Sequence, residues 1–133
     1  MSKPKILIIE DDLALRQLYE KRFQFADFDV LIASDGEVGM QLALSELPDI
    51  VLLDILLPKM GGLGVLRNLK TQPHTKDIPI VVMTAYDVDT YRLEAQPYCD
   101  KFFLKSDLRP MDFVREINDL LEQKKKQLDG LEK

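Results

Sequence analysis

The sequence contains one cysteine, no tryptophan and no long hydrophobic run, and its acidic residues outnumber its basic ones. The single thiol, Cys99, excludes an internal disulfide and a metal site built from several cysteines. No apolar stretch approaches the roughly 20 residues that a membrane-spanning helix requires, and the N-terminus lacks the apolar core of a signal peptide. The formal net charge of −5 does not favour nucleic-acid binding through phosphate neutralisation. We therefore expect a cytoplasmic protein without direct contacts to membrane or nucleic acid.

Five short apolar runs are the main feature that the sequence does contain. They are continuous rather than alternating, which is typical of strands covered on both faces, and they span residues 5–10, 29–33, 50–54, 78–83 and 101–105. Helix-type spacing separates them over residues 13–25, 36–47, 62–70, 87–96 and 110–123. The helix over 36–47 carries Val38, Leu42 and Leu44 at this spacing. The alternation predicts an α/β fold of (βα)5 type, a doubly wound parallel five-stranded sheet with helices on both faces.

The residues after the last predicted helix are polar. We assign residues 1–123 to the domain and residues 124–133 to a polar C-terminal tail or the start of a linker. A heptad-like spacing runs through this region, formed by Val114, Ile117, Leu121, Lys124, Leu128 and Leu131. The simplest interpretation is a frayed helix end, and the alternative is a helix that extends into a dimer contact or a linker.

Polar side chains stand where the predicted strands end. Glu10 and Asp11 follow the first strand, Asp54 ends the third, and Thr84 and Lys105 end the fourth and fifth. Ligands of open α/β sheets bind outside the carboxyl ends of the strands, where the strand order reverses. In the flavodoxin-like order 2-1-3-4-5 this point lies between strands one and three. Asp11 and Asp54 would then be neighbours, with Thr84 and Lys105 closing the other side.

These residue types suit phosphoryl chemistry at a metal ion. Clustered carboxylates repel one another and hold protons unless a cation neutralises them. Oxygen-only ligands favour a hard divalent ion, and Mg²⁺ usually takes one or two carboxylates and leaves room for a phosphate. A lysine and a hydroxyl can hold phosphoryl oxygens, and Asp54 could act as a nucleophile that forms an aspartyl-phosphate. Mg²⁺ is the expected cofactor, and the neighbouring Asp12 is expected to cap a helix.

Four motifs in this order and at these spacings carry a resemblance to a known family. They are ILIIEDD (6–12), LLDILLPKMGG (52–62), VVMTA (81–85) and FFLK (102–105). Over nearly its whole length the chain resembles the receiver domain of two-component response regulators. The resemblance implies that Asp54 takes a phosphoryl group from a phosphohistidine on a sensor histidine kinase or a phosphotransfer protein.

The resemblance also implies roles for the surrounding residues. Glu10, Asp11, Asp54 and the backbone carbonyl of Leu56 would surround Mg²⁺, and Thr84 and Lys105 would contact the phosphoryl group. Thr84 and Phe102 would form the switch. The fourth helix, fifth strand and fifth helix, roughly residues 87–121, would signal to a downstream protein or to an output domain. The chain would be a signalling phosphoacceptor, not an enzyme, and a monomer or weak homodimer.

Three features depart from the family pattern. Ser106 stands where most members place a proline after the lysine, which leaves the direction of that lysine open. Pro97 and Cys99 occupy a turn that is usually Gly-Ala, which predicts a short or displaced fourth helix. In the family, the side chains at the positions of Leu56 and Tyr86 flank the path of the hydrolytic water, so an apolar pair predicts slow self-dephosphorylation.

Three other functions compete with this one. A phosphatase of the haloacid-dehalogenase type needs a second acid two residues after the nucleophile, where this chain has Leu56. A flavin or nucleotide binder needs a Gly- or Ser/Thr-rich phosphate loop after the first strand, where this chain is acidic. A degenerate receiver that serves only as an interaction module is the alternative, and the complete set of predicted site residues argues against it.

Overall fold

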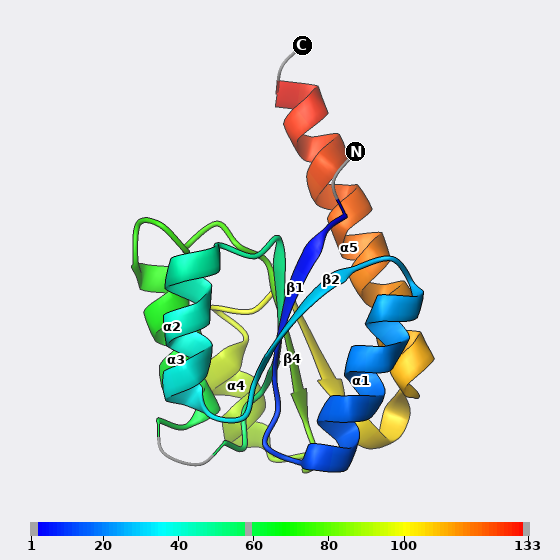
Figure 1. Cartoon of the computed structure of the whole chain (residues 1–133). Helices are drawn as coiled ribbons and strands as arrows, with labels where there is room; N and C mark the ends of the chain where they lie inside the picture. Colours follow the sequence, from blue (N-terminus) through cyan, green and yellow to red (C-terminus); the bar gives the residue numbers. More distant parts are fainter. Residues whose placement is uncertain (1–2, 58–59, 132–133) are drawn as a thin grey trace.

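A computed structural model of the chain describes residues 3–57 and 60–131. Five parallel strands form one sheet in the order β2-β1-β3-β4-β5 (Figure 1). The strands are β1 Lys5–Ile9, β2 Asp29–Ala33, β3 Ile50–Asp54, β4 Ile80–Thr84 and β5 Lys101–Leu104. The predicted strand order and the parallel pairing are confirmed. Pro58 and Lys59, in the predicted glycine loop, lie outside the described residues.

Helices cover both faces of the sheet, as the alternating pattern predicted. The five are α1 Leu13–Phe25, α2 Gly36–Glu46, α3 Gly62–Thr71, α4 Asp89–Ala95 and α5 Pro110–Leu131. α1 and α5 lie on one face, and α2, α3 and α4 lie on the other (Figure 1). α4 has only seven residues, which confirms the expectation of a short fourth helix. Within the described residues, no helix has both the length and the apolar content needed to cross a bilayer.

The core consists of two apolar layers separated by the sheet. On the α1 and α5 side, Phe23, Phe113 and Ile117 are fully buried, and Tyr19 meets Phe113 edge to face with ring centroids 5.7 Å apart. On the other side the strands pack against α2, α3 and α4, with Leu66 fully buried. Burial on both faces explains why these strands read as continuous apolar runs. It also fixes the register of β1, β3 and β4, on which the position of the site depends.

α5 continues past residue 123, where the sequence suggested that the last helix ends. It is helical to Leu131, and its final turns project past the amino ends of the strands, on the side of the molecule where the N-terminus lies (Figure 1). Leu121 is still half-buried, but Leu128 is 62% exposed. Lys124 ties this part of the helix to the body through an ion pair with Asp100 at 3.2 Å. The domain boundary at residue 123 stays a prediction.

Candidate phosphoryl and metal site

Two acidic residues follow β1 and a third ends β3, and the sheet places them side by side. In the parallel pair β1 and β3, Ile9 lies opposite Leu53. Glu10 and Asp54 are the next residues along these two neighbouring segments. Both side chains are almost fully buried, whereas Asp11 is exposed. One oxygen from each of these three acids lies within 4.8 Å of the other two. The strand-end argument predicted this juxtaposition.

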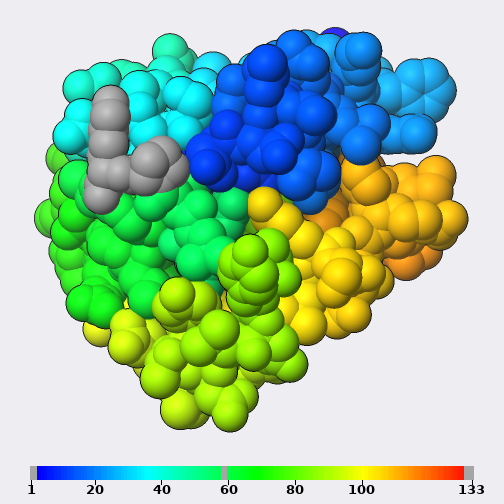
Figure 2. Space-filling model, turned by 90° about the horizontal axis from the view of Figure 1, so that it is seen from below, coloured from blue at the N-terminus to red at the C-terminus, as the bar shows by residue number. Residues whose placement is uncertain are grey.

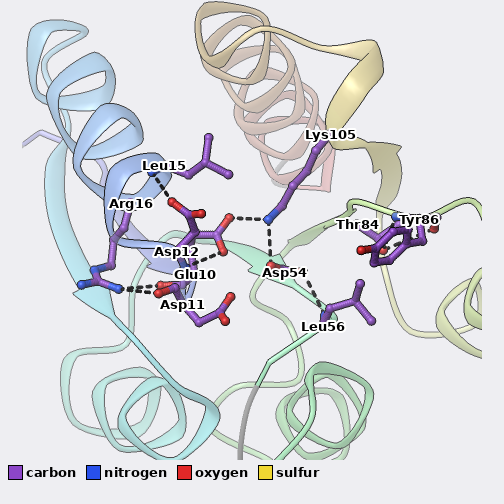
Figure 3. A network of polar contacts seen from close by, with 10 residues as sticks. All are labelled: Glu10, Asp11, Asp12, Leu15, Arg16, Asp54, Leu56, Thr84, Tyr86 and Lys105. Carbon is purple, nitrogen blue, oxygen red and sulfur yellow. Dashed lines mark hydrogen bonds and ion pairs between the residues drawn. The ribbon is translucent and has the colours of Figure 1, made fainter.

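The site opens at the carboxyl ends of the strands. Figure 2 looks onto this face, where the segment after β1 (blue), the loop after β3 (green) and the segment after β5 (yellow to orange) meet. Lys105, the residue after β5, extends from this last segment into the acidic cluster (Figure 3). Three segments far apart in the sequence therefore form one surface.

Lys105 bridges the two buried carboxylates. Its Nζ lies 2.8 Å from Asp54 Oδ2 and 2.5 Å from Glu10 Oε1, and the side chain is itself only 14% exposed. Ser106 lies in a short 3₁₀ turn, Lys105–Asp107. The serine in place of the usual proline therefore does not direct the lysine away from the acids.

Backbone N–H groups hold further oxygens of the same carboxylates. The N–H of Leu56 donates to Asp54 Oδ1 at 2.9 Å, and the N–H of Asp12 donates to Glu10 Oε2 at 3.2 Å. Asp12 also caps α1, because its Oδ1 accepts a hydrogen bond from the N–H of Leu15, and this prediction is confirmed. The two buried carboxylates are thus held in defined orientations.

The shared ammonium does not neutralise all three acids. Burial raises the pKa of Glu10 from 4.5 to about 7; the hydrogen bond from Lys105 opposes this effect and the charge of Asp54 adds to it. Burial alone would lower the pKa of Lys105, but hydrogen bonds to Asp54 and Glu10 outweigh it and raise that pKa. With three carboxylates around one ammonium, the cluster keeps negative charge that favours a further cation.

Thr84 stands at the end of β4, beside the cluster. Asp54 pairs with Met83, so Thr84 lies one residue further along the neighbouring strand. Its side chain is fully buried. The hydroxyl contacts the backbone of Tyr86, accepting from the N–H at 3.3 Å and donating to the carbonyl at 3.4 Å. The carboxylate, lysine and hydroxyl predicted from the strand ends thus lie on one edge of the sheet, although Thr84 bonds to its own loop.

The other predicted residues surround this edge. Leu56 is half-buried next to Asp54, and Tyr86 is 64% exposed in the loop after β4. Phe102 is half-buried in β5 and packs against the layer formed with α2, α3 and α4. The guanidinium of Arg92 lies over its ring. Nothing in these positions assigns the roles that the family resemblance implies, and those roles stay predictions.

Arg16 also lies at the site, although no sequence motif predicted it there. Its Nη1 donates to the backbone carbonyls of Glu10 at 3.0 Å and of Asp11 at 3.3 Å. A signal was present: Arg16 lies near the N-terminus of α1, where the helix dipole disfavours positive charge. A basic residue at that place needs a partner, and here the partners are the carbonyls of the acidic segment.

The donor set fits Mg²⁺. The three candidate side chains offer only oxygens, and at least two of them are held by hydrogen bonds from the protein. Hard divalent ions prefer such ligands, and Mg²⁺ is typically held by one or two carboxylates with water and phosphate completing its shell. The exposed position of Asp11 leaves the cluster open on one side to a second ligand.

A family model for the response regulator receiver domain matches residues 6–111. The chain belongs to this family of receiver domains, and the phosphoacceptor role is the family's standard function. Among its curated relatives is the DNA-binding dual master transcriptional regulator RpaA of Synechocystis sp., 42% identical over 82 residues, which are 62% of this chain and 34% of RpaA. Response regulator PleD of Caulobacter vibrioides is 40% identical over 83 residues, which are 62% of this chain and 18% of PleD. The chain thus spans about a third or less of the length of these relatives.

Solved structures agree with this assignment. The CheY-like receiver domain protein of Methanospirillum hungatei superposes with a TM-score of 0.88 over 95% of this chain and 99% of that one, at 24% identity. The BeF3-activated N-terminal receiver domain of RstA from Klebsiella pneumoniae gives a TM-score of 0.78 at 30% identity, over 88% of this chain and 97% of that one. The first comparison supports the fold, and the second supports the family as well.

Proposed function

We propose that Asp54 is the phosphoacceptor of this receiver domain. The observation that carries the proposal is the Lys105 ammonium, 2.8 Å from Asp54 Oδ2, beside an acidic cluster suited to a metal. In the transfer, an Asp54 oxygen bonds to phosphorus as the bond from phosphorus to an imidazole nitrogen of the donor breaks. The P–N electron pair stays on the ring, which carries a proton on its other nitrogen and so leaves as neutral imidazole, and an acyl phosphate remains on Asp54.

Glu10, Asp11, Asp54 and the backbone carbonyl of Leu56 would hold Mg²⁺. The ion, when bound, neutralises charge on the phosphoryl oxygens during transfer. The other functions belong to residues of the chain. The N–H of Leu56 orients Asp54, and the Lys105 ammonium would contact an oxygen of the incoming phosphoryl group.

The response to phosphorylation would pass through Thr84 and Phe102. Thr84 would leave its loop contact with Tyr86 to donate to a phosphoryl oxygen, and Phe102 would change its packing on β5. Phosphorylation would thereby favour one of two arrangements of the surface formed by α4, β5 and α5. That surface would bind a downstream protein or an output domain.

The donor would be a sensor histidine kinase or a phosphotransfer protein. Within this proposal the chain is a signalling phosphoacceptor in the cytoplasm that assists its own phosphorylation and dephosphorylation. Residues 1–123 form the receiver, acting as a monomer or weak homodimer. The relative RpaA is described as DNA-binding. The net charge of −5, however, supports no direct contact of this chain with nucleic acid or membrane.

Intact mass after incubation with Mg²⁺ and acetyl phosphate tests the proposal. The wild type should gain one phosphoryl group, about 80 Da, and Asp54→Asn should gain none. Asp12→Asn is the matched control, because asparagine caps a helix as well as aspartate, and it should be phosphorylated like the wild type. Loss of the gain in the control, or its persistence in Asp54→Asn, would assign the phosphoryl group elsewhere.

A further inference from the structure

Asp11 differs from the other two acids of the site in how it is held. Glu10 and Asp54 are buried and each accepts from Lys105 and from a backbone N–H. Asp11 is exposed, and among the described residues no hydrogen bond to its carboxylate is found. The position of this carboxylate therefore depends on the backbone that carries it.

Arg16 holds that backbone. One guanidinium nitrogen, Nη1, donates both to the carbonyl of Glu10 and to that of Asp11, at 3.0 and 3.3 Å. Two consecutive carbonyls can converge on one nitrogen only if the chain between them is curled. Figure 3 shows Arg16 reaching this segment from the left, while Lys105 approaches the carboxylates from the right.

The helix that carries Arg16 is fixed to the same segment. Asp12 caps α1 through the N–H of Leu15, and the backbone N–H of Arg16 donates to the carbonyl of Asp12 at 2.9 Å. Arg16 as a residue is half-buried, and its backbone is anchored to the segment that its side chain contacts. A planar guanidinium in a fixed place is a more defined donor than a flexible ammonium.

We propose that Arg16 is a positioning residue for the metal site, which sets the place of the Asp11 carboxylate through its backbone. This inference rests on the metal site proposed above. It assigns Arg16 no contact with the metal or with the phosphoryl group. Arg16 would orient a metal ligand without binding the metal itself. Mutation of residues in this role typically lowers metal affinity by about 10- to 100-fold.

The sign of the effect separates positioning from simple charge. Removing a positive charge near a cation site should tighten cation binding if charge alone matters. Removing a positioning residue should weaken it. Arg16→Met keeps the aliphatic length and loses the donors, so we expect Mn²⁺ affinity to fall about tenfold. Arg16→Lys keeps the charge and can donate from a single flexible ammonium, so we expect a smaller fall.

Free Mn²⁺ measured by electron paramagnetic resonance in a titration of the chain gives this affinity, since Mn²⁺ accepts the same oxygen ligands as Mg²⁺. Arg22→Met, an exposed arginine later in α1, is the matched control and should bind like the wild type. In an Asp11→Asn background, Arg16→Met should have no further effect, because the ligand that it positions is gone.

Unchanged or tighter binding by Arg16→Met, with the wild type binding normally, would overturn this inference and leave the phosphoacceptor proposal intact. If Arg16→Met lowers Mn²⁺ affinity as much in the Asp11→Asn background as in the wild type, the inference is also overturned, because Arg16 would then act through another residue. A wild type that binds no Mn²⁺ would overturn both the metal site and the role of Arg16. Thermal unfolding of each variant shows whether its fold is intact. If Arg16→Met has lost structure, the Mn²⁺ affinity of Arg16→Lys is the test.

Discussion

Arg92 lies over the ring of Phe102, with its Cζ 5.3 Å from the ring centroid. The same guanidinium pairs with Asp87 at 3.0 Å, in the loop between β4 and α4. One side chain thus connects the loop that follows Thr84 to the aromatic residue of β5. If Thr84 and Phe102 form the switch, Arg92 restrains the second of them in the unphosphorylated protein.

Replacing Arg92 by methionine should release the Phe102 ring. A partly exposed cation–π contact contributes about 0.5–1 kcal/mol, so ring rotamer populations should change by about two- to fivefold. Selectively labelled Phe102 in NMR spectra reports this change. Arg67→Met, which removes an exposed ion pair with Glu94, is the control. A ring signal equally unaffected by both variants would show that Arg92 does not restrain it.

Lys105 should stabilise the metal-free fold. Lys105→Met leaves Glu10 and Asp54 buried without their shared cation, and such a loss costs about 3–5 kcal/mol. Urea unfolding in EDTA measures it, and added Mg²⁺ should restore more stability to the variant than to the wild type. Lys101→Met, which breaks a more exposed pair with Glu116, should cost less. Equal losses in the two variants would contradict the bridging role.

The raised pKa of Glu10 gives a pH dependence with a definite sign. Its folded value, about 7, exceeds the ordinary 4.5 because of burial. The folded protein therefore binds this proton more tightly than the unfolded chain, and the stability gained is full below pH 4.5 and lost as the pH rises towards 7.

Urea unfolding of metal-free protein at several pH values between 4.5 and 7.5 tests this dependence. The free energy of unfolding should decline in the wild type relative to Glu10→Gln, which cannot titrate. The pKa values of Asp100 and Asp112 are lowered from 3.8, so these two groups change the free energy of unfolding mainly at pH values below this window. A constant difference between wild type and Glu10→Gln would exclude the titration.

Gly62 should be intolerant of any side chain. A Cβ at this position would lie 2.2 Å from Ile55 Cα and 2.6 Å from the carbonyl oxygen of Asp54, both backbone atoms. Gly62→Ala should therefore separate α3 from the end of β3 and cost about 3 kcal/mol in thermal or urea unfolding. Gly61→Ala is the control, because among the described residues, its chain neighbours apart, no atom lies within 4 Å of the Cβ position. Similar stabilities of the two variants would mean that α3 can shift at little cost.

Leu56 and Tyr86 should slow the loss of phosphate from Asp54. The double variant Leu56→Asn, Tyr86→Ser replaces an apolar pair by small polar residues, which admit water to the site more readily. We expect its phosphoryl lifetime to be shorter by several-fold, as measured by intact mass against time after removal of the donor. A variant lifetime equal to or longer than that of the wild type would refute this role.

The strands and the strand-end residues could be predicted because both depend on local sequence. In runs such as residues 50–54 every residue before the terminal Asp54 is apolar, since the sheet is covered on both faces, and parallel pairing then places Glu10 beside Asp54. The buried faces of the helices were harder to predict. Val38 and Leu44 of the predicted 36–47 helix are 37% and 41% exposed. α2 instead buries Met40 together with small residues, and a Cβ on Gly39 would lie 2.6 Å from Ile9 Cδ1.

The place of Arg16 near the N-terminus of α1 indicated that it needs a partner, but which groups it contacts could not be predicted. Arg16 donates to carbonyls, which every residue has, so no pairing of residue types reveals the contact. The length of α5 was underestimated because polar residues after 123 end the apolar pattern without ending the helix. Strong helix formers such as lysine and glutamine continue it.

α5 is longer than the sheet on which it packs. Its 22 residues correspond to about 33 Å at 1.5 Å per residue, whereas a five-residue strand spans about 17 Å. Roughly ten residues therefore project past the last buried leucines, as a helical segment about 15 Å long. A tilt of about 10° at the packed end would move the tip by about 2–3 Å by simple geometry. Small displacements at β5, whose Phe103 packs against Phe113 of α5, would thus become larger ones at the far end of the molecule. The ion pair between Lys124 and Asp100 lies close to the point about which the helix would turn.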